Sequence, residues 1–300
     1  MPLPLRTRLS SLRVLTQWCC VQKKADLVPP VLKLLWILLG TGEVHRDQHI
    51  PLGVRSRLRL FAAQCILKLA TCDAYASLIL PRMGRLSYAL QDECFQVRMH
   101  LLHDLLLYLM RDELPTEFHA AIFLVAFDPE DEPRVQVASY TRRLQVLPPI
   151  VRHERLERII VRFLHLLAHH PDLNAESPQT LCSFARYLEF YLACVACETN
   201  IGVLARFSAC VRTYIDLSLS EPSVENSRPL YAMAELAQFL IQRLADNHGW
   251  TIYPVDEEAP CPKDILRSTG TIARSVLDGE VWELLQQQPR RHRDKKTKVA

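Results

Sequence analysis

The feature that most constrains this chain is an arginine placed in the apolar face of a helical pattern, six residues after an aspartate. Over residues 91–110, apolar side chains recur every three to four positions, which predicts an amphipathic helix. Arg98 falls inside the apolar arc, and Asp92 stands where the helix starts, a position that favours an acidic side chain. Because an arginine is costly in apolar surroundings unless it is paired, we predict that Asp92 and Arg98 form a structural ion pair.

The same arrangement recurs along the chain. Asp128 and Arg134 are again six residues apart at the start of the next predicted helix, and we predict a second pair there. An earlier apolar helix places Arg59 in the same frame, so that the three arginines are separated by 39 and 36 residues. A helical unit with a period of about 40 residues is typical of HEAT repeats, which predicts an all-α, HEAT/armadillo-like α-solenoid of antiparallel helix pairs. The alternative is that ordinary amphipathic helices share this spacing by chance.

The composition favours helices over other architectures. Apolar residues make up 49 % of the 300 residues, glycines number only 8, and the 19 prolines lie mostly between apolar runs. The apolar periodicity predicts helices over residues 29–39, 54–70, 73–80, 81–90 (broken), 91–110, 115–127, 128–147, 152–169, 179–197, 201–219, 229–245 and 271–287. We therefore divide the chain into an undefined N-terminal segment (1–28), a HEAT-repeat solenoid (29–246), a Pro-rich strap with a terminal helix (247–288) and a basic disordered tail (289–300).

The positive charge is concentrated in the tail. The net charge is +3, and the tail sets six basic residues against Asp294, so the rest of the chain is slightly acidic and is not a general nucleic-acid binder by charge. The basic tail residues are Arg290, Arg291, Arg293, Lys295, Lys296 and Lys298. A nuclear localisation signal, a weak DNA contact and plain disorder all remain open for them.

The first 24 residues contain five basic residues and no acid. That composition permits a mitochondrial transit peptide; the alternative is the edge of a larger protein with a remnant helix. No apolar run approaches the ~20 residues needed to cross a bilayer, so we expect no membrane span.

Cysteine and histidine motifs give no clear site. The ten cysteines are scattered, which favours buried thiols in a reducing compartment over a disulfide framework. Cys194 and Cys197 match half of a zinc or redox motif but stand in an apolar helix, where core packing is favoured. His165 and His169 have the spacing of a metal-binding pair but lack the Glu of HExxH, so we attribute them to a helix C-terminus. We expect no metal, no cofactor and no enzyme.

A basic stretch follows the acidic turn at residues 128–132. Its arginines are Arg142, Arg143, Arg152, Arg155 and Arg158, interrupted by Glu154 and Glu157. The first interpretation is a solvated helix face with ion pairs between neighbouring turns. The second is a strip on the solenoid that binds an acidic peptide or a polyanion.

Four segments resemble, in the same order, those of a known family. They are LKLLWILLGT (32–41), LRLFAAQCILKLA (58–70), QDECFQVR (91–98) and HLLAHHPDL (165–173). They are similar to the Pds-five (precocious dissociation of sisters) family of sister chromatid cohesion proteins, over residues 30–220 and weakly to about 260. The chain resembles a piece of the C-terminal half of that family's HEAT-repeat spine.

The resemblance implies a nuclear, chromosome-associated, non-enzymatic scaffold bound to the kleisin subunit of cohesin. It further implies a role in cohesion and in cohesin release, indirect contact with chromatin, and neither a membrane nor a small-molecule substrate. The basic stretch is then the candidate kleisin contact. The alternatives are a HEAT-repeat adaptor unrelated to cohesin and, from another class, a thiol or metal enzyme.

Overall fold

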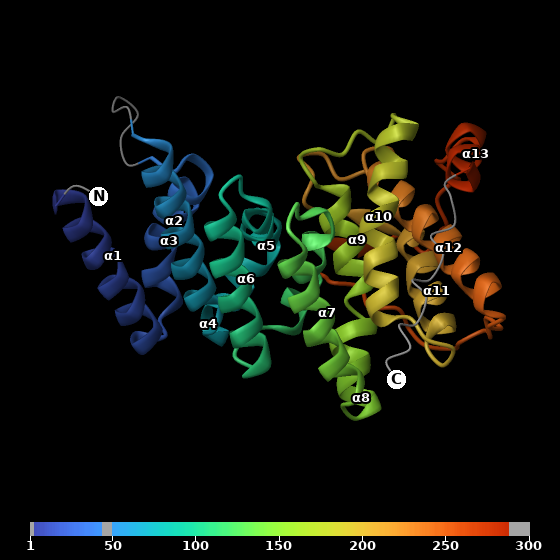
Figure 1. The fold of residues 1–300 in the computed structure, drawn as a ribbon, viewed down its shortest axis with the longest axis horizontal. Coiled ribbons are helices and arrows are strands. Elements are labelled where there is room, and N and C mark those ends of the chain that lie inside the picture. Colours follow the sequence, from blue (N-terminus) through green and yellow to red (C-terminus); the bar gives the residue numbers. More distant parts are fainter. Residues whose placement is uncertain (1–2, 44–49, 288–300) are drawn as a thin grey trace, which may run out of the picture.

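The computed structural model describes residues 3–43 and 50–287, and its helices follow one another along the long axis of the molecule (Figure 1). The predicted all-α, HEAT-like solenoid is confirmed. The α-helices are α1 (Leu3–Gln22), α2 (Val28–Thr41), α3 (Leu52–Ala70), α4 (Asp73–Ile79), α5 (Met83–Ser87), α6 (Phe95–Met110), α7 (Asp131–Gln145), α8 (Pro149–Arg152), α9 (Ile160–Ala168), α10 (Pro178–Val195), α11 (Ile201–Cys210), α12 (Arg228–His248) and α13 (Gly279–Gln287).

Short 3-10 and π segments join many of these helices. They are η1 (Ala25–Leu27), η2 (Leu80–Arg82), η3 (Tyr88–Gln91), η4 (Thr116–Phe127), the π-helical η5 (His153–Glu157) and η6 (Val211–Thr213). Of these, η4 is buried almost throughout, and Phe123 at its centre is fully buried. The Phe123 ring contacts the rings of Tyr191 and Phe163 at centroid separations of 4.9 and 5.7 Å. Tertiary packing from several sides therefore sustains a 3-10 segment longer than is usual.

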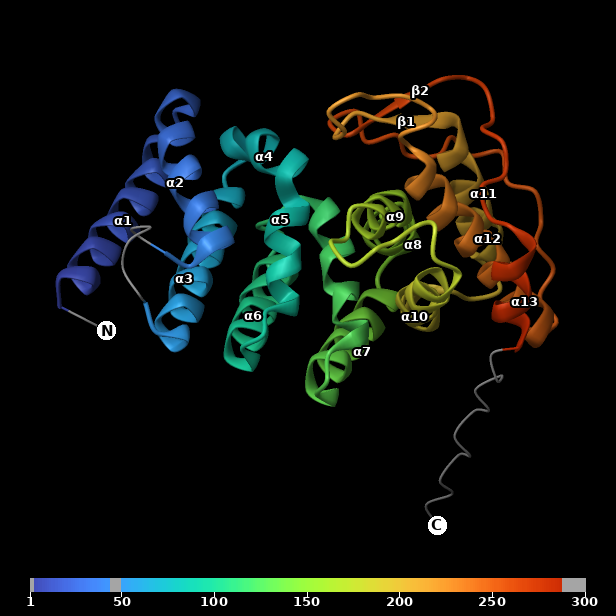
Figure 2. The ribbon, with the colours of Figure 1, turned by 90° about the horizontal axis from the view of Figure 1, so that it is seen from above.

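The N-terminal helices α1 and α2 both pack on α3, and α3 packs on α6 (Figure 2). Local sequence explains the limits of α2: Pro29 and Pro30 occupy its first positions, and Gly42 ends it with a φ of 64°, in the left-handed region. Residues 1–28, left undefined by sequence analysis, include α1. The basic tail lies outside the described residues.

The C-terminal part departs from the predicted helices at two places. The helix predicted over 201–219 stops at Cys210, and the chain continues through η6 into β1 (Tyr214–Asp216). This strand pairs antiparallel with β2 (Leu266–Ser268), about 50 residues away in the sequence. The pairing satisfies backbone groups that a longer helix would have satisfied internally, and it adds a two-stranded ribbon to the helical array.

The terminal helix is also shorter than the predicted 271–287. It begins only at Gly279, because the backbone N–H groups of Val276 and Leu277 donate to the carboxylate of Glu235 on α12. The residues before α13 cross the helices as an extended strap. A side chain at position 202 would place its Cβ 2.6 Å from the main-chain oxygen of Tyr253, so only Gly202 allows the strap to lie so close to α11.

The cysteines carry no disulfide, and Cys194 is buried. Burial raises the pKa of the Cys194 thiol to about 11, which disfavours the thiolate that redox or metal chemistry requires. Within residues 3–43 and 50–287, no helix combines the length and apolarity needed to cross a membrane.

The buried His119 of η4 predicts a loss of stability in acid. Its Nδ1–H donates to the main-chain oxygen of Thr116 at 2.8 Å, and its Nε2 accepts from the Tyr140 hydroxyl at 2.9 Å. Burial lowers the pKa of His119 to about 4 from the ordinary 6.5. Between these two values the unfolded chain binds a proton that the folded chain does not, so stability falls as the pH falls through this window.

We therefore expect the wild type to lose about 2 kcal/mol more unfolding free energy than His119→Gln between about pH 6.5 and about pH 5. Urea unfolding at the two pH values measures the difference. His100→Gln, at an exposed position of α6, is the matched control and should behave as the wild type does. An unchanged pH dependence in His119→Gln would contradict the assignment.

Candidate functional site

The arginines that recur along the chain bind carboxylates across successive helical units. Arg59 donates through Nε and Nη2 to the Asp92 carboxylate at 2.5 and 3.0 Å. Arg98 donates in the same way to the Asp128 carboxylate at 2.7 and 3.1 Å. These two-pronged bonds tie α3 to the start of α6, and α6 to the start of α7. They form a ladder that fixes how the units stack.

The predicted pairs within one unit are therefore corrected. Arg98 reaches only the main-chain oxygen of Asp92, at 2.9 Å, and Arg134 likewise donates to the main-chain oxygen of Asp128. The aspartate side chains turn the other way, because each accepts the N–H two residues on, from Cys94 or Glu130. That turn aims each carboxylate at the arginine of the preceding unit.

The ladder is most buried at its middle rung. Arg98 and Asp128 are each only 6 % exposed. Burial by itself would raise the pKa of Asp128, but the Arg98 guanidinium outweighs it and holds the pKa below its usual value. In contrast, Arg134 pairs with Asp131 of the same helix, whose side chain is 89 % exposed, so this pair links no further unit and is open to solvent.

The basic stretch divides into two groups. Three of its arginines have acidic partners: Arg152 with Glu157, Arg155 with Asp112, and Arg158 with Glu154 and the strap residue Glu257. The remaining two, Arg142 and Arg143 of α7, are exposed and contact no carboxylate in the described part of the chain. Arg142 Nε donates to its own helix at the Ala138 oxygen, and Arg143 Nη1 lies 3.8 Å from Met110 Sδ.

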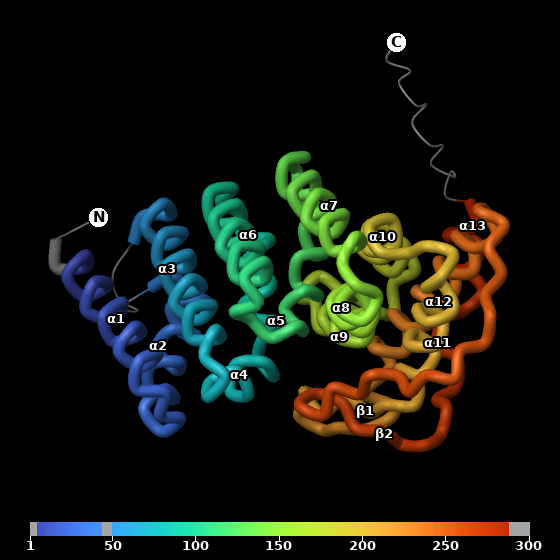
Figure 3. Tube along the Cα trace, turned by 90° about the horizontal axis from the view of Figure 1, so that it is seen from below, coloured from blue at the N-terminus to red at the C-terminus, as the bar shows by residue number. Residues whose placement is uncertain are grey.

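Exposed apolar side chains follow these two arginines closely in the chain. Val146 and Ile150 are 83 % and 80 % exposed, the highest values among the large apolar side chains of the described residues. Val135 is exposed as well, and its helical position places it on the same stripe of α7 as Arg142 and Val146. We call Val135, Arg142, Arg143, Val146 and Ile150 the α7 surface. Figure 3 shows α7 at one edge of the array, away from α4 and the strand pair.

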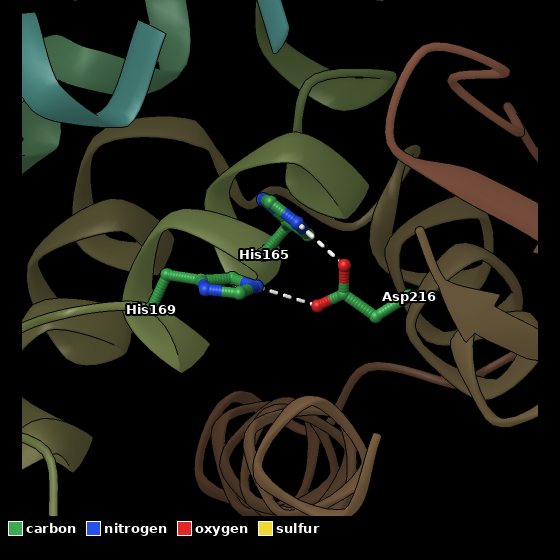
Figure 4. Close-up of side chains that lie close together, drawn as sticks. All are labelled: His165, His169 and Asp216. Carbon is green, nitrogen blue, oxygen red and sulfur yellow. Dashed lines mark hydrogen bonds and ion pairs between the residues drawn. The ribbon is translucent and has the colours of Figure 1, made fainter. Parts of the chain in front are cut away.

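A second cluster lies under the strap, where His165, His169 and Asp216 meet (Figure 4). His165 Nε2 lies 3.3 Å from Asp216 Oδ1, and His169 Nε2 lies 2.5 Å from Oδ2. Burial lowers the pKa of His165. Burial by itself would raise the pKa of Asp216, but the two imidazoles outweigh it and hold that pKa well below its usual range. The two histidines were recognisable by their spacing, but Asp216 was not, because β1 meets α9 only in the folded chain.

These features define the class of the protein as a HEAT-type α-solenoid with a mixed basic and apolar edge. The resemblance read from four segments is confirmed: a family model described as sister chromatid cohesion protein PDS5 protein matches residues 1–267. The chain belongs to this family. The match includes the N-terminal segment that the sequence analysis left undefined.

Curated relatives agree with this family. The chain is 27 % identical over 245 residues to sister chromatid cohesion protein pds5 of Schizosaccharomyces pombe, covering 81 % of this chain and 20 % of that protein. It is 23 % identical over 280 residues to sister chromatid cohesion protein PDS5 of Saccharomyces cerevisiae, covering 84 % of this chain and 22 % of that protein. It is 34 % identical over 157 residues to sister chromatid cohesion protein PDS5 homolog A of Danio rerio, covering 48 % of this chain and 12 % of that protein. The chain thus spans only about a fifth, or less, of these relatives.

Proposed function

We propose that this chain is a non-enzymatic scaffold that acts in sister chromatid cohesion on chromosomes in the nucleus. Membership of a family whose relatives are named for sister chromatid cohesion supports the role. The partner is the cohesin complex, and the direct ligand is an extended segment of its kleisin subunit. By binding that segment, the scaffold acts both in the maintenance of cohesion and in the release of cohesin. The scaffold contacts chromatin indirectly, through cohesin.

The α7 surface supports a binding role more directly than any other feature. Two arginines that contact no carboxylate among the described residues are followed closely in the chain by Val146 and Ile150, whose side chains are almost fully exposed. Exposed apolar side chains that form a contiguous patch mark contact surfaces, and this is the role that we assign to the α7 surface. A disordered segment that alternates acidic and apolar residues matches this surface, because it supplies a carboxylate for each arginine and cover for each apolar side chain.

The three paired arginines have a different role in this proposal. Arg155 binds Asp112, which follows α6, at 2.5 Å, and Arg158 reaches Glu257 of the strap at 3.6 Å. Their charges are already compensated within the chain. They hold η5 against its neighbours and so fix the edge beside which the ligand lies, while Arg142 and Arg143 meet the ligand itself.

We expect charge reversal on the α7 surface to weaken kleisin binding. In a fluorescence titration of a labelled kleisin segment with the full chain, Arg142→Glu/Arg143→Glu should raise the Kd at least about tenfold, close to 1.4 kcal/mol. The matched control is Arg82→Glu/Arg85→Glu, which changes the net charge equally at exposed positions near α5, away from α7 (Figure 3). That control should bind as the wild type does.

Salt separates this proposal from nucleic-acid binding. Kleisin binding should weaken only moderately between 50 and 200 mM salt, whereas duplex DNA held by six or more phosphate contacts would lose about 10³-fold or more. An equal loss of kleisin affinity in both double variants would overturn the proposal. Binding of duplex DNA with no detectable kleisin binding would overturn it as well. Absence of kleisin among cross-linked partners in dividing cells would favour an adaptor unrelated to cohesin.

A further inference from the structure

We propose that His165, His169 and Asp216 form a zinc site that clips β1 to α9. The histidines lie one helical turn apart at the end of α9, His169 directly after the last helical residue. Asp216 ends β1 and is 2 % exposed. The three side chains come from two segments that only the fold brings together, and both imidazole rings turn their Nε2 atoms toward the same carboxylate (Figure 4).

The distances suit a small cation. The three ligand atoms all lie within 4.8 Å of one another. Tetrahedral zinc with bonds of ~2.0–2.1 Å places its ligand atoms roughly 3.3 Å apart. The separation of His165 Nε2 from Asp216 Oδ1 is 3.3 Å, which meets this value without movement. His169 Nε2 contacts the other carboxylate oxygen, Oδ2, at 2.5 Å; this separation must open by under ~1 Å for zinc to bind, and the His169 side chain is 30 % exposed.

The donor set selects the class of metal. Two imidazole nitrogens and one carboxylate oxygen suit zinc, whereas magnesium and calcium prefer sites built from oxygen alone. In the site without metal, the carboxylate accepts N–H bonds from both rings. With zinc bound, each ring is a neutral imidazole with its proton on Nδ1, and the Nε2 lone pair faces the metal. Ser218 Oγ, 3.1 Å from His165 Nε2, or a water takes the fourth position.

Neighbouring hydrogen bonds hold the carboxylate in place. Asp216 Oδ1 accepts the backbone N–H of Ser218 at 2.8 Å, and the Asp216 backbone N–H donates to Ser227 Oγ at 3.1 Å. Such outer bonds orient metal ligands and raise their affinity. Because β1 pairs with β2, a metal at this point also anchors the strap, so we assign it a structural role.

Zinc binding is tested on the full chain after chelator treatment. One equivalent of zinc chloride is added, free metal is removed by gel filtration, and retained zinc is measured by mass spectrometry. We expect one zinc per chain and a raised Tm. His169→Gln should weaken zinc binding at least about 100-fold, since it removes a direct ligand where loss of an outer bond already costs 10–100-fold. Asp216→Asn should act in the same direction.

Two control variants exclude other donors. His100→Gln removes an exposed histidine, and Cys197→Ser removes a thiol of the Cys194/Cys197 motif; both should retain wild-type zinc. Cobalt substitution should give visible d–d absorption without a thiolate charge-transfer band. A wild type that retains no zinc, zinc retained in His169→Gln, or a thiolate band would overturn the proposal. If Asp216→Asn does not fold, the more exposed His169 position decides the question.

Discussion

Arg98→Ala is expected to lower the free energy of unfolding by about 3–5 kcal/mol, because it leaves a buried carboxylate without its cation. The Arg98 side chain is 7 % exposed, and that of its partner Asp128 only 1 %. The same guanidinium also satisfies the main-chain oxygens of Asp92 and Glu93 at 2.9 and 3.3 Å. Urea unfolding of the variant beside the wild type gives the difference. The destabilisation should come from weaker packing of α6 against α7.

Arg155→Ala is the matched comparison for Arg98→Ala. Arg155 also forms an ion pair, but its partner Asp112 has a side chain that is 65 % exposed. Because Asp112 is largely exposed, this pair should contribute only ~0–1 kcal/mol, and Arg155→Ala should unfold close to the wild type although the Arg155 side chain itself is 18 % exposed. Equal unfolding free energies for the two variants would remove the distinction between the buried rung and the solvated pair. A double-mutant cycle of Arg98→Ala with Asp128→Asn should show coupling beyond 1 kcal/mol.

The second large effect is expected at Glu235, which the sequence analysis did not single out. Its side chain is 5 % exposed on α12, and its carboxylate accepts the N–H groups of Val276 and Leu277 at 3.0 Å each and the Ser275 hydroxyl at 2.9 Å. Glu235→Ala removes the acceptor of these three donors and also the carboxylate that Arg212 Nε contacts at 3.4 Å. We expect it to cost about 3 kcal/mol, the upper range for hydrogen bonds to a charged group.

Removing the Glu235 carboxylate should loosen the strap locally, in addition to lowering the overall free energy of unfolding. Hydrogen exchange should show faster exchange of the Val276 and Leu277 amides in Glu235→Ala, with the amides of α6 unchanged. Glu225→Ala is the control, because the Glu225 side chain is 84 % exposed and pairs with Arg228 on the surface. A C-terminal strap that exchanges at the wild-type rate in Glu235→Ala would show that the carboxylate does not anchor it.

The helical period and the positions of the ladder residues could be predicted from local runs of residues. Each helical unit is encoded in contiguous residues, so the apolar spacing around Arg98 and the aspartate at its start were readable without a structure. It could also be predicted that Arg98, a cation in an apolar helix face, needs an acidic partner. The family could be recognised for the same reason, since the four matching segments lie within single helical units.

Which side chains meet across the units became clear from the folded chain. The carboxylate that binds Arg98 comes from Asp128 in the next unit, 30 residues away, and not from Asp92. Asp216 reaches His165 from 51 residues away through a strand that the helical pattern had hidden. Periodicity fixes which face of a helix is buried, but the contacts across that face depend on the stacking of units and the path of the strap. Those arise from packing between distant segments, which no local run of residues specifies.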